Sequence, residues 1–344
     1  MSASKHLLVI RLSAMGDVAM TVPVLSALKK QYPDVQITVL TRDFLKPLFS
    51  QLPNVDVYVA DVDGKHKGVF GLRKLYKELK VLKIDAVADL HNVLRSNILK
   101  TYFKLGGFQF AQIDKGRTEK KALTALENKV FKPLKTTHQR YADVFDALNF
   151  PLNLKDSSFL TKRALSEKTE KLLESGNGKR IGIAPFAAFE GKMYPLDLME
   201  QVISQLSQTN KILLFGGGEK EQKQLEAWEK QFPNTVSIVG KLRFSEELDL
   251  ISNLDMMLAM DSGNAHLASL FAIPTVTLWG VTHPYAGFYP FGQDIENALL
   301  ADREKFPLIP TSVYGNKMPD GYSEAMRTIL PEDVLEKINT IIEK

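Results

Sequence analysis

Residues 257–284, MLAMDSGNAHLASLFAIPTVTLWGVTHP, contain the pattern that decides the fold. An apolar run leads into a turn at Asp261-Ser262-Gly263-Asn264, then a helical stretch and a second apolar run, which indicates a strand, a turn, a helix and a strand. A helix N-terminus presents unpaired backbone N–H groups and the positive end of the helix dipole, so it can bind a phosphate group. Ser262, Asn264 and His266 add side-chain donors within about one turn. The stretch therefore predicts a site for the diphosphate of a nucleotide sugar.

The same alternation of apolar runs and helical spacing fills the rest of the chain. Runs that predict parallel strands lie at 6–12, 36–42, 55–61, 84–91 and 108–114, and the pattern restarts at 180–186. We therefore expect an α/β fold of two doubly wound, Rossmann-like domains that face one central cleft, with ligands at the carboxyl ends of the strands. The expected segments are an N-terminal domain over 1–155, a linker over 156–178, a C-terminal domain over 179–330 and a C-terminal helix over 331–344 that can pack back on the N-terminal domain.

Composition indicates an ordinary soluble protein with an anionic partner. Of the 344 residues 44% are hydrophobic and none is cysteine, which excludes disulfides, thiolate metal sites and cysteine nucleophiles. No run approaches the roughly 20 apolar residues of a membrane span, and the N-terminal apolar run is too short for a signal peptide, so we expect a cytoplasmic protein. Residues 1–150 carry 24 lysines and arginines against 14 aspartates and glutamates, whereas the remainder is acidic. A basic half suits nucleic acid, phospholipid or an acidic glycolipid, unless it is only a solvated surface.

Several side chains have the chemistry of a group-transfer site, although each also has a purely structural interpretation. Asp17 follows Gly16 in the first strand-to-helix loop, where it can act as a general base or simply favour the helix dipole. Lys192 can neutralise a diphosphate or be one of many surface lysines. Gly216-Gly217-Gly218 permit close approach of the backbone to a ligand, and Glu219 or Glu221 can accept hydrogen bonds from ribose hydroxyls.

Other motifs argue against other chemistries. The first loop lacks G-x-G-x-x-G, which argues against a dinucleotide enzyme, and neither G-x-S-x-G nor a P-loop is present. Asp61-Val62-Asp63 resembles the D-x-D motif of metal-dependent sugar transferases, but two carboxylates before Gly64 are equally expected of a turn. The histidines are not spaced as zinc ligands, and the basic half has few interleaved aromatic residues. We expect no metal and no nucleic-acid partner.

Taken together, the motifs resemble those of the bacterial ADP-heptose:lipopolysaccharide heptosyltransferases, which are inverting glycosyltransferases of GT-B fold. The resemblance covers nearly the whole chain. The motifs that carry it are S-x-M-G-D at 13–17, a D-L-Q-x-x-x-R-S-like segment at 89–96 with His91 in place of Gln, K-x-W-P at 192–195 with Tyr194 in place of Trp, D-S-G-x-x-H-L-A at 261–268, and G-x-T-x-P at 280–284. Ala187-Ala188 stand where relatives often have hydroxyl residues, which weakens the assignment of heptose as the donor sugar.

The resemblance implies a role for each matched position. Asp17 would be the catalytic base, and Lys192 would stabilise the departing ADP. The donor would be bound by Gly216, Gly217, Gly218, Glu219 or Glu221, Asp261, Ser262, Gly263 and His266. The anionic acceptor, a lipid A–Kdo type of glycolipid, would be bound by His91, Arg95, Arg117 and Lys120.

The resemblance implies a metal-independent transfer of heptose from ADP-heptose to the inner core of a lipopolysaccharide precursor. The enzyme would work without a cofactor, in peripheral contact with the cytoplasmic face of the inner membrane. Alternatives are a GT-B transferase that uses a UDP-sugar, a GT-B epimerase, and a non-catalytic protein that binds a nucleotide sugar.

Overall fold

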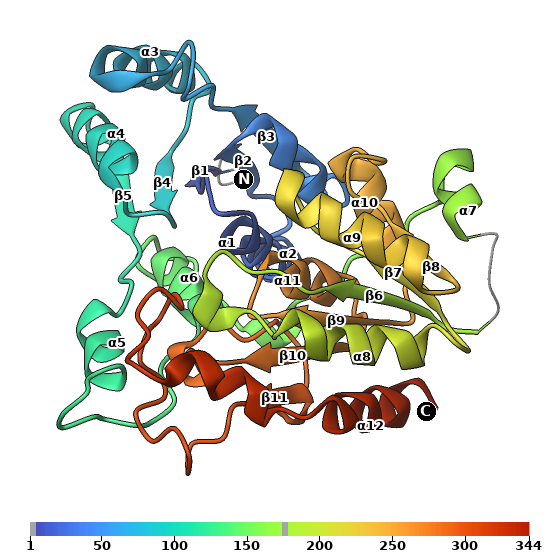
Figure 1. The fold of residues 1–344 in the computed structure, drawn as a ribbon. Helices are drawn as coiled ribbons and strands as arrows, with labels where there is room; N and C mark the ends of the chain where they lie inside the picture. Colours follow the sequence, from blue (N-terminus) through green and yellow to red (C-terminus); the bar gives the residue numbers. More distant parts are fainter. Residues whose placement is uncertain (1–4, 174–177, 344) are drawn as a thin grey trace. The chain divides into compact units, whose positions relative to one another are not determined.

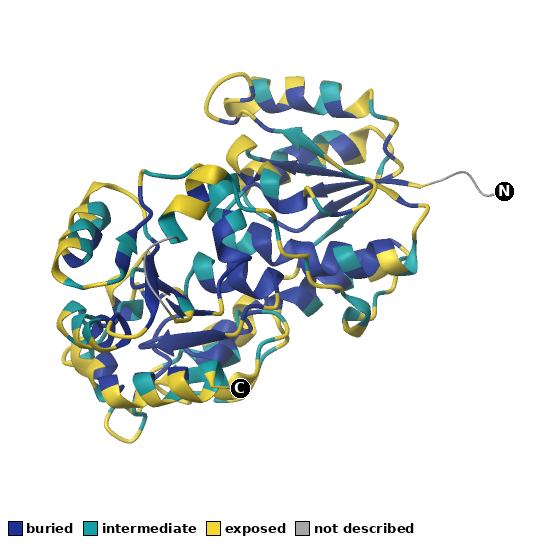
Figure 2. Cartoon of the chain, turned by 90° about the vertical axis from the view of Figure 1, so that its right-hand side faces the viewer, coloured by how far each residue is buried: buried dark blue, intermediate teal, exposed yellow. Residues whose placement is uncertain are grey.

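The computed structural model describes residues 5–173 and 178–343, and these form two compact units. Unit 1 comprises residues up to Gly116 together with Lys135–Phe159, and unit 2 comprises Arg117–Leu134 together with Leu160 onwards. In both units the central strands are buried, whereas three of the strands at the sheet edges are partly exposed, and the outward sides of the helices are exposed (Figure 2). Each unit is an α/β sandwich, as the alternating sequence pattern predicts.

Unit 1 is built on a five-stranded parallel sheet in the order β3-β2-β1-β4-β5 (Figure 1). Its strands are β1 (His6–Ile10), β2 (Gln36–Thr41), β3 (Val55–Val59), β4 (Ala86–Asp89) and β5 (Gln109–Gln112). Its helices are α1 (Met15–Ala19), α2 (Thr21–Gln31), α3 (Gly68–Lys80), α4 (Leu94–Leu105) and α6 (Thr137–Asp146), with short 3-10 helices η1 (Asp43–Phe49) and η2 (Leu154–Asp156). The four leucine, valine and isoleucine side chains of β1 are fully buried, because helices cover both faces of the sheet.

Unit 2 contains a six-stranded parallel sheet in the order β11-β10-β9-β6-β7-β8. Its strands are β6 (Arg180–Ala184), β7 (Lys211–Leu214), β8 (Thr235–Ser237), β9 (Met256–Met260), β10 (Thr275–Trp279) and β11 (Ala298–Leu300). Its helices are α5 (Arg117–Leu123), α7 (Glu167–Leu173), α8 (Leu196–Leu206), α9 (Glu219–Gln231), α10 (Phe244–Ile251), α11 (Gly263–Leu270) and α12 (Pro331–Ile342), with 3-10 helices η3 (Glu190–Lys192), η4 (Pro284–Ala286), η5 (Ile295–Asn297) and η6 (Tyr322–Thr328). The predicted strand–turn–helix–strand over 257–284 corresponds to β9, α11 and β10.

Two features of unit 2 differ from the expected domain organisation. Residues 117–134, expected in the N-terminal domain, belong to unit 2. They are held there by Lys129, whose Nζ donates to the Pro310 carbonyl at 2.7 Å, by the Leu134 N–H, which donates to the Tyr285 carbonyl, and by stacking of Arg303 on Phe131.

The C-terminal helix α12 also lies within unit 2. It packs on α8, and its Val334 and Ile338 are fully buried in the core of unit 2. The helix therefore packs on its own unit, and the expectation that it can also pack back on the N-terminal domain stays a prediction. The physical reason for the packing on unit 2 is the apolar stripe of the helix, which the core of unit 2 buries.

Candidate active site

The predicted phosphate-binding turn has the expected local geometry. Asp261 follows β9, and Ser262 is the N-cap residue of α11 with extended backbone angles. The Ser262 hydroxyl is buried and makes no hydrogen bond to the residues that the structure describes. Its oxygen therefore does not cap α11, which leaves both the hydroxyl and the first N–H groups of the helix, from Gly263 onward, for an anion.

Lys192 lies beside this turn. Its Nζ is 2.8 Å from Asp261 Oδ2, and the two side chains are 15% and 7% exposed. The stem of Lys192 crosses Gly315, where a Cβ atom would lie 2.3 Å from Lys192 Cγ. Gly191 is equally confined, because its carbonyl accepts from the Val281 N–H and a Cβ would meet Val281 at 2.5 Å. The lysine predicted to bind a diphosphate is thus held in place, with its charge balanced by Asp261.

The triple glycine forms the loop between β7 and α9. Gly218 is the N-cap of α9 at φ +82°, a conformation that favours glycine. Glu221 Oε2 accepts the Gly217 N–H at 2.6 Å, so this carboxylate holds the glycine loop. Glu219 is exposed. The two glutamates that the sequence leaves as alternatives therefore differ in structure: one supports the loop, and the other faces solvent.

Two buried groups accompany the turn in unit 2. His266 is on α11 and is 7% exposed. Thr282, in the G-x-T-x-P motif, is 1% exposed, and its Oγ1 has no hydrogen-bond partner among the described residues. An unpaired buried hydroxyl is costly unless a ligand or water completes it. The sequence points to Thr282 only through the G-x-T-x-P motif, and this motif alone predicts no role for its side chain.

In unit 1, Asp17 forms an ion pair that the sequence did not reveal. Asp17 is the third residue of α1, and its Oδ2 accepts the Ala14 N–H at 3.2 Å and contacts the Arg11 guanidinium. Arg11 is 6% exposed and also donates to the Leu90 carbonyl at 2.7 Å. Burial lowers the pKa of Arg11, but Tyr141 and Asp17 outweigh this and raise it above its ordinary value. Arg11 is therefore a permanent cation that orients the Asp17 carboxylate.

His91 lies close to this pair. It is 7% exposed, and its Nε2 is 3.5 Å from the Ser13 hydroxyl. Burial, followed by the charge of Arg11, lowers its pKa to about 3, so the imidazole is neutral at physiological pH. The fully buried Asp89 fixes the segment by accepting the N–H groups of His91 and Asn92.

The structure does not bring the four predicted acceptor residues together in one unit. His91 and Arg95 belong to unit 1, and Arg95 is exposed at the start of α4. Arg117 and Lys120 belong to unit 2, on α5. Lys120 is 8% exposed and its Nζ lies 4.0 Å from the centre of the Phe288 ring, so it contributes to the packing of residues 117–134.

The D-x-D motif forms a turn. The Asp61 carboxylate accepts the N–H groups of Gly64 and Lys65, and Asp63 is paired with Arg42. Residues 5–173 and 178–343 contain no cluster of three carboxylate or histidine side chains that could hold a metal ion. Asp61 therefore uses its oxygens for the local turn.

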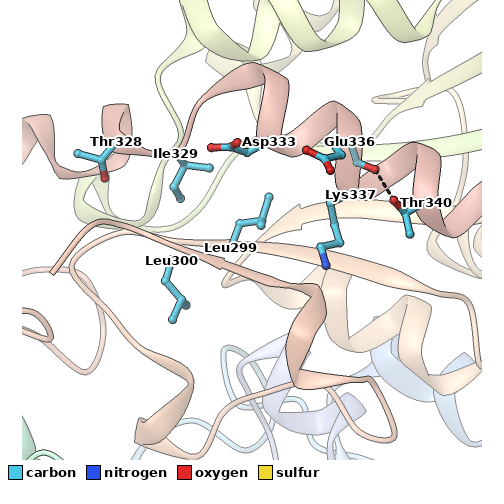
Figure 3. A pocket seen from close by; sticks show the side chains of 8 residues that line it. All are labelled: Leu299, Leu300, Thr328, Ile329, Asp333, Glu336, Lys337 and Thr340. Carbon is cyan, nitrogen blue, oxygen red and sulfur yellow. Dashed lines mark hydrogen bonds between the residues drawn. The ribbon is translucent and has the colours of Figure 1, made fainter.

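A cavity of about 360 Å³ lies elsewhere in unit 2, between β11 and α12 (Figure 3). It is lined by Leu299, Leu300, Thr328, Ile329, Asp333, Glu336, Lys337 and Thr340. None of the predicted site residues lines it. The Lys192–Asp261 pair, the unpaired Ser262 hydroxyl and the Arg11–Asp17 pair all lie outside this cavity.

Comparison with known proteins finds a family and several relatives. A model of glycosyltransferase family 9 (heptosyltransferase) matches residues 72–308. The lipooligosaccharide heptosyltransferase 2 of Haemophilus influenzae is 27% identical over 367 aligned positions, which cover 98% of this chain and 100% of that protein.

Two solved structures share the fold. The glycosyl transferase family 9 protein of Veillonella parvula matches with a TM-score of 0.76 and 19% identity, over 100% of this chain and 99% of that chain. The E. coli ADP-heptose lps heptosyltransferase II matches with a TM-score of 0.68 and 18% identity, over 98% of both chains. The fold is thus the GT-B class expected from the sequence, with two Rossmann-like units. The chain is a glycosyltransferase and belongs to glycosyltransferase family 9, the heptosyltransferases.

Proposed function

We propose that this heptosyltransferase transfers heptose from ADP-heptose to the inner core of a lipopolysaccharide precursor with inversion at C1. The observation that carries the proposal is the turn after β9, where Lys192, the unpaired Ser262 hydroxyl and the N-terminus of α11 come together. These groups suit a diphosphate leaving group. The names of the relatives, which include a lipooligosaccharide heptosyltransferase and an ADP-heptose transferase, support the donor and the acceptor.

The proposed reaction is a single displacement. An Asp17 oxygen takes the proton of the acceptor hydroxyl, the hydroxyl oxygen bonds to C1 of the sugar, and the bond from C1 to the diphosphate oxygen breaks and releases ADP. Both contacts of Asp17 described above use Oδ2, so we assign Oδ1 to the proton. Arg11 holds the carboxylate in position, and a general base of this kind contributes about 10²–10⁴-fold to the rate.

The charge that develops on ADP is stabilised by unit 2. We assign Lys192, the Ser262 hydroxyl and the N–H groups from Gly263 to the diphosphate, with His266 and Thr282 beside them. Glu219 is the better placed glutamate for the ribose, because Glu221 already holds the Gly217 N–H. Removing one preorganised donor of this kind costs about 3–4 kcal/mol in the transition state. A cation and a helix terminus can perform this task without a metal, so we propose metal-independent transfer that persists in EDTA.

The proposed acceptor is an anionic glycolipid of the lipid A–Kdo type. His91 and Arg95 in unit 1, and the exposed Arg117 in unit 2, are the side chains that we assign to it. In the described part of the chain no helix has the length and apolarity that crossing a bilayer requires. We propose peripheral action at the cytoplasmic face of the inner membrane, without a nucleic-acid partner.

The decisive experiment compares Asp17→Asn with Asp43→Asn. Asp43 is an exposed carboxylate in the first turn of η1, after β2 of the same sheet, so it controls for loss of one charge at this edge. We expect Asp17→Asn to lower kcat by about 10²–10⁴-fold while the affinity for ADP is unchanged, and Asp43→Asn to retain full turnover. Near-normal transfer by Asp17→Asn would remove the base assignment.

Two further experiments test the rival functions. Preferential binding of UDP over ADP, in a competition experiment, would favour a transferase or an epimerase that uses a UDP-sugar. Binding of ADP-heptose without transfer or hydrolysis, with wild-type protein and a lipid A–Kdo acceptor, would favour a non-catalytic binding protein.

A further inference from the structure

The outward face of α3 carries positive charge from one end to the other. Arg73, Lys74, Lys77 and Lys80 are all exposed and recur at the spacing of one helical face. The opposite face, which contains Leu72, Leu75 and Leu79, is buried in the core of unit 1. The only acidic residue of α3 is Glu78, which lies off this face and is engaged by Lys65, His66 and Tyr58.

Large apolar side chains lie at both ends of the same face. Phe70, in the first turn of α3, is 86% exposed, and Val81, directly after the last turn, is 77% exposed. We refer to Phe70, Arg73, Lys74, Lys77, Lys80 and Val81 as the α3 face. The α3 face therefore combines exposed apolar side chains with four cations, the two chemistries that a membrane interface binds.

The neighbouring helix continues this surface. α4 packs beside α3 (Figure 1). Tyr76 and Tyr102 stack between the two helices, at 5.7 Å between ring centres. Leu94 and Leu105, at the two ends of α4, are 76% and 82% exposed. Together the two helices contain seven lysines and arginines and one glutamate.

This surface is connected to the base through the topology of the sheet. All strands of unit 1 are parallel, and α1, α3 and α4 each begin after the carboxyl end of a strand. The starts of α3 and α4, with Phe70 and Leu94, therefore lie at the same edge of the sheet as Asp17.

We propose that the α3 face is the surface with which unit 1 docks on an anionic phospholipid bilayer. The lysines and Arg73 lie against the negative headgroups, and the exposed side chains of Phe70 and Val81 insert into the interface. The proposal deepens the proposed function, which requires an acceptor embedded in a membrane.

The exposed apolar side chains distinguish a bilayer from a nucleic acid. Phosphate groups of DNA or RNA would be satisfied by the four cations alone and would gain nothing from Val81 or Leu105. A bilayer interface uses both chemistries at once, because cations bind the headgroups and apolar side chains bury their surface among the acyl chains.

The test measures binding of the full-length protein to vesicles by co-sedimentation. The vesicles contain either phosphatidylcholine alone or phosphatidylcholine with phosphatidylglycerol. Lys74→Gln/Lys77→Gln removes two charges from the α3 face, and Lys223→Gln/Lys230→Gln removes the same charge from exposed positions on α9. Each lysine near an anionic surface contributes about fivefold to the binding affinity. We therefore expect Lys74→Gln/Lys77→Gln to bind anionic vesicles about 30-fold more weakly, and Lys223→Gln/Lys230→Gln to bind them as wild type does. Phe70→Ser should weaken binding about tenfold at any salt concentration.

Three outcomes would overturn the proposal: equal binding of wild type to both kinds of vesicle, wild-type binding by the Lys74/Lys77 variant, or equal losses in the two double variants. Competition by DNA with no effect of Phe70→Ser would instead identify a nucleic-acid surface. Transfer to a soluble acceptor without acyl chains separates this inference from the reaction itself. There the α3 variants should keep wild-type turnover, whereas failure of wild type to transfer would count against the proposed function and leave vesicle binding unaffected.

Discussion

The ion pair between Lys192 and Asp261 should dominate the response of unit 2 to mutation at the donor site. Lys192→Met preserves the stem that crosses Gly315 but leaves the Asp261 carboxylate, 7% exposed, without its cation. Removing one partner of a buried pair typically costs about 3–5 kcal/mol, and we expect about 3 kcal/mol here. Asp261→Asn should cost only about 1–2 kcal/mol, because Asn still accepts a hydrogen bond from the more exposed lysine.

The double variant separates the pair from its surroundings. If the pair has the geometry described above, Lys192→Met/Asp261→Asn should cost about 1–2 kcal/mol, well below the sum of about 4–5 kcal/mol, because no buried charge remains unpaired. Urea unfolding followed by tryptophan fluorescence reports on unit 2 alone, since both tryptophans, Trp228 and Trp279, are buried there. If the losses in unfolding free energy of the two single variants add up to that of the double variant within about 0.5 kcal/mol, the two side chains are not paired.

A surface pair in the same unit provides the matched control. Arg327 donates two hydrogen bonds to Asp197, at 2.8 and 3.0 Å, but the side chains are 43% and 58% exposed. The corresponding cycle, Arg327→Met with Asp197→Asn, should show a much smaller coupling because water screens the pair.

The Lys192→Met variant also tests whether Lys192 binds the diphosphate of ADP. Wild-type unit 2 should gain stability in ADP as the nucleotide saturates it. Lys192→Met should weaken ADP binding by about 10–100-fold, the value of a hydrogen bond to a charged group of about 1.5–3 kcal/mol. Unchanged protection by ADP in Lys192→Met would show that Lys192 does not bind the diphosphate.

Two further predictions concern pH. Burial lowers the pKa of His91 to about 3, below its ordinary 6.5, so the unfolded chain binds an extra proton between these values and stability falls as the pH drops through this window. Calorimetric melting from about pH 7 to about pH 5 should show a shallower loss in His91→Gln, by about 1.4 kcal/mol per pH unit, and parallel curves would contradict this. Burial raises the pKa of Glu247 to about 7, above its ordinary 4.5. The folded protein therefore binds an extra proton between these values, and its free energy of unfolding falls as the pH rises from 4.5 to 7. Glu247→Gln should therefore stabilise the protein by about 2 kcal/mol at about pH 8 and by nothing near pH 4.5, and equal melting temperatures at the higher pH would contradict this.

The sequence predicts most of the strands because parallel strands are buried on both faces. β1 and β9 read as uninterrupted apolar runs, and both are fully buried. β11 was missed because its apolar run, Ala298–Leu300, has only three residues and lies at an edge of the sheet, where it is at most half-buried. The helical stretch around and after Asp17 is divided at Met20 into α1 and α2, with Pro23 in the first turn of α2.

The sequence predicts a site residue when its position depends on a local motif, and misses it when residues distant in the sequence form the contacts. The position of Ser262 at the start of a helix follows from the strand–turn–helix pattern around it. Arg11 appeared merely to interrupt an apolar run, because its partner Asp17 and the Leu90 carbonyl are brought to it by α1 and β4. Thr282 is similar, since nothing in its local sequence shows that the hydroxyl is buried without a partner.

The charge of the first 150 residues shows why exposure must replace composition as evidence for an anionic partner. Several of its cations are committed within the protein: Arg11 is paired with Asp17, Lys29 donates to the Pro33 carbonyl at 2.6 Å, and Lys129 donates to the Pro310 carbonyl. Burial, followed by the charge of Arg303, even lowers the pKa of Lys129 to about 8. A cation that is buried against carbonyls has no charge to offer a ligand, whereas the cations of the α3 face are exposed and point away from the core. The exposed cations of the α3 face are therefore available to an anionic partner, and the membrane that we propose is a partner whose chemistry also accounts for Phe70 and Val81.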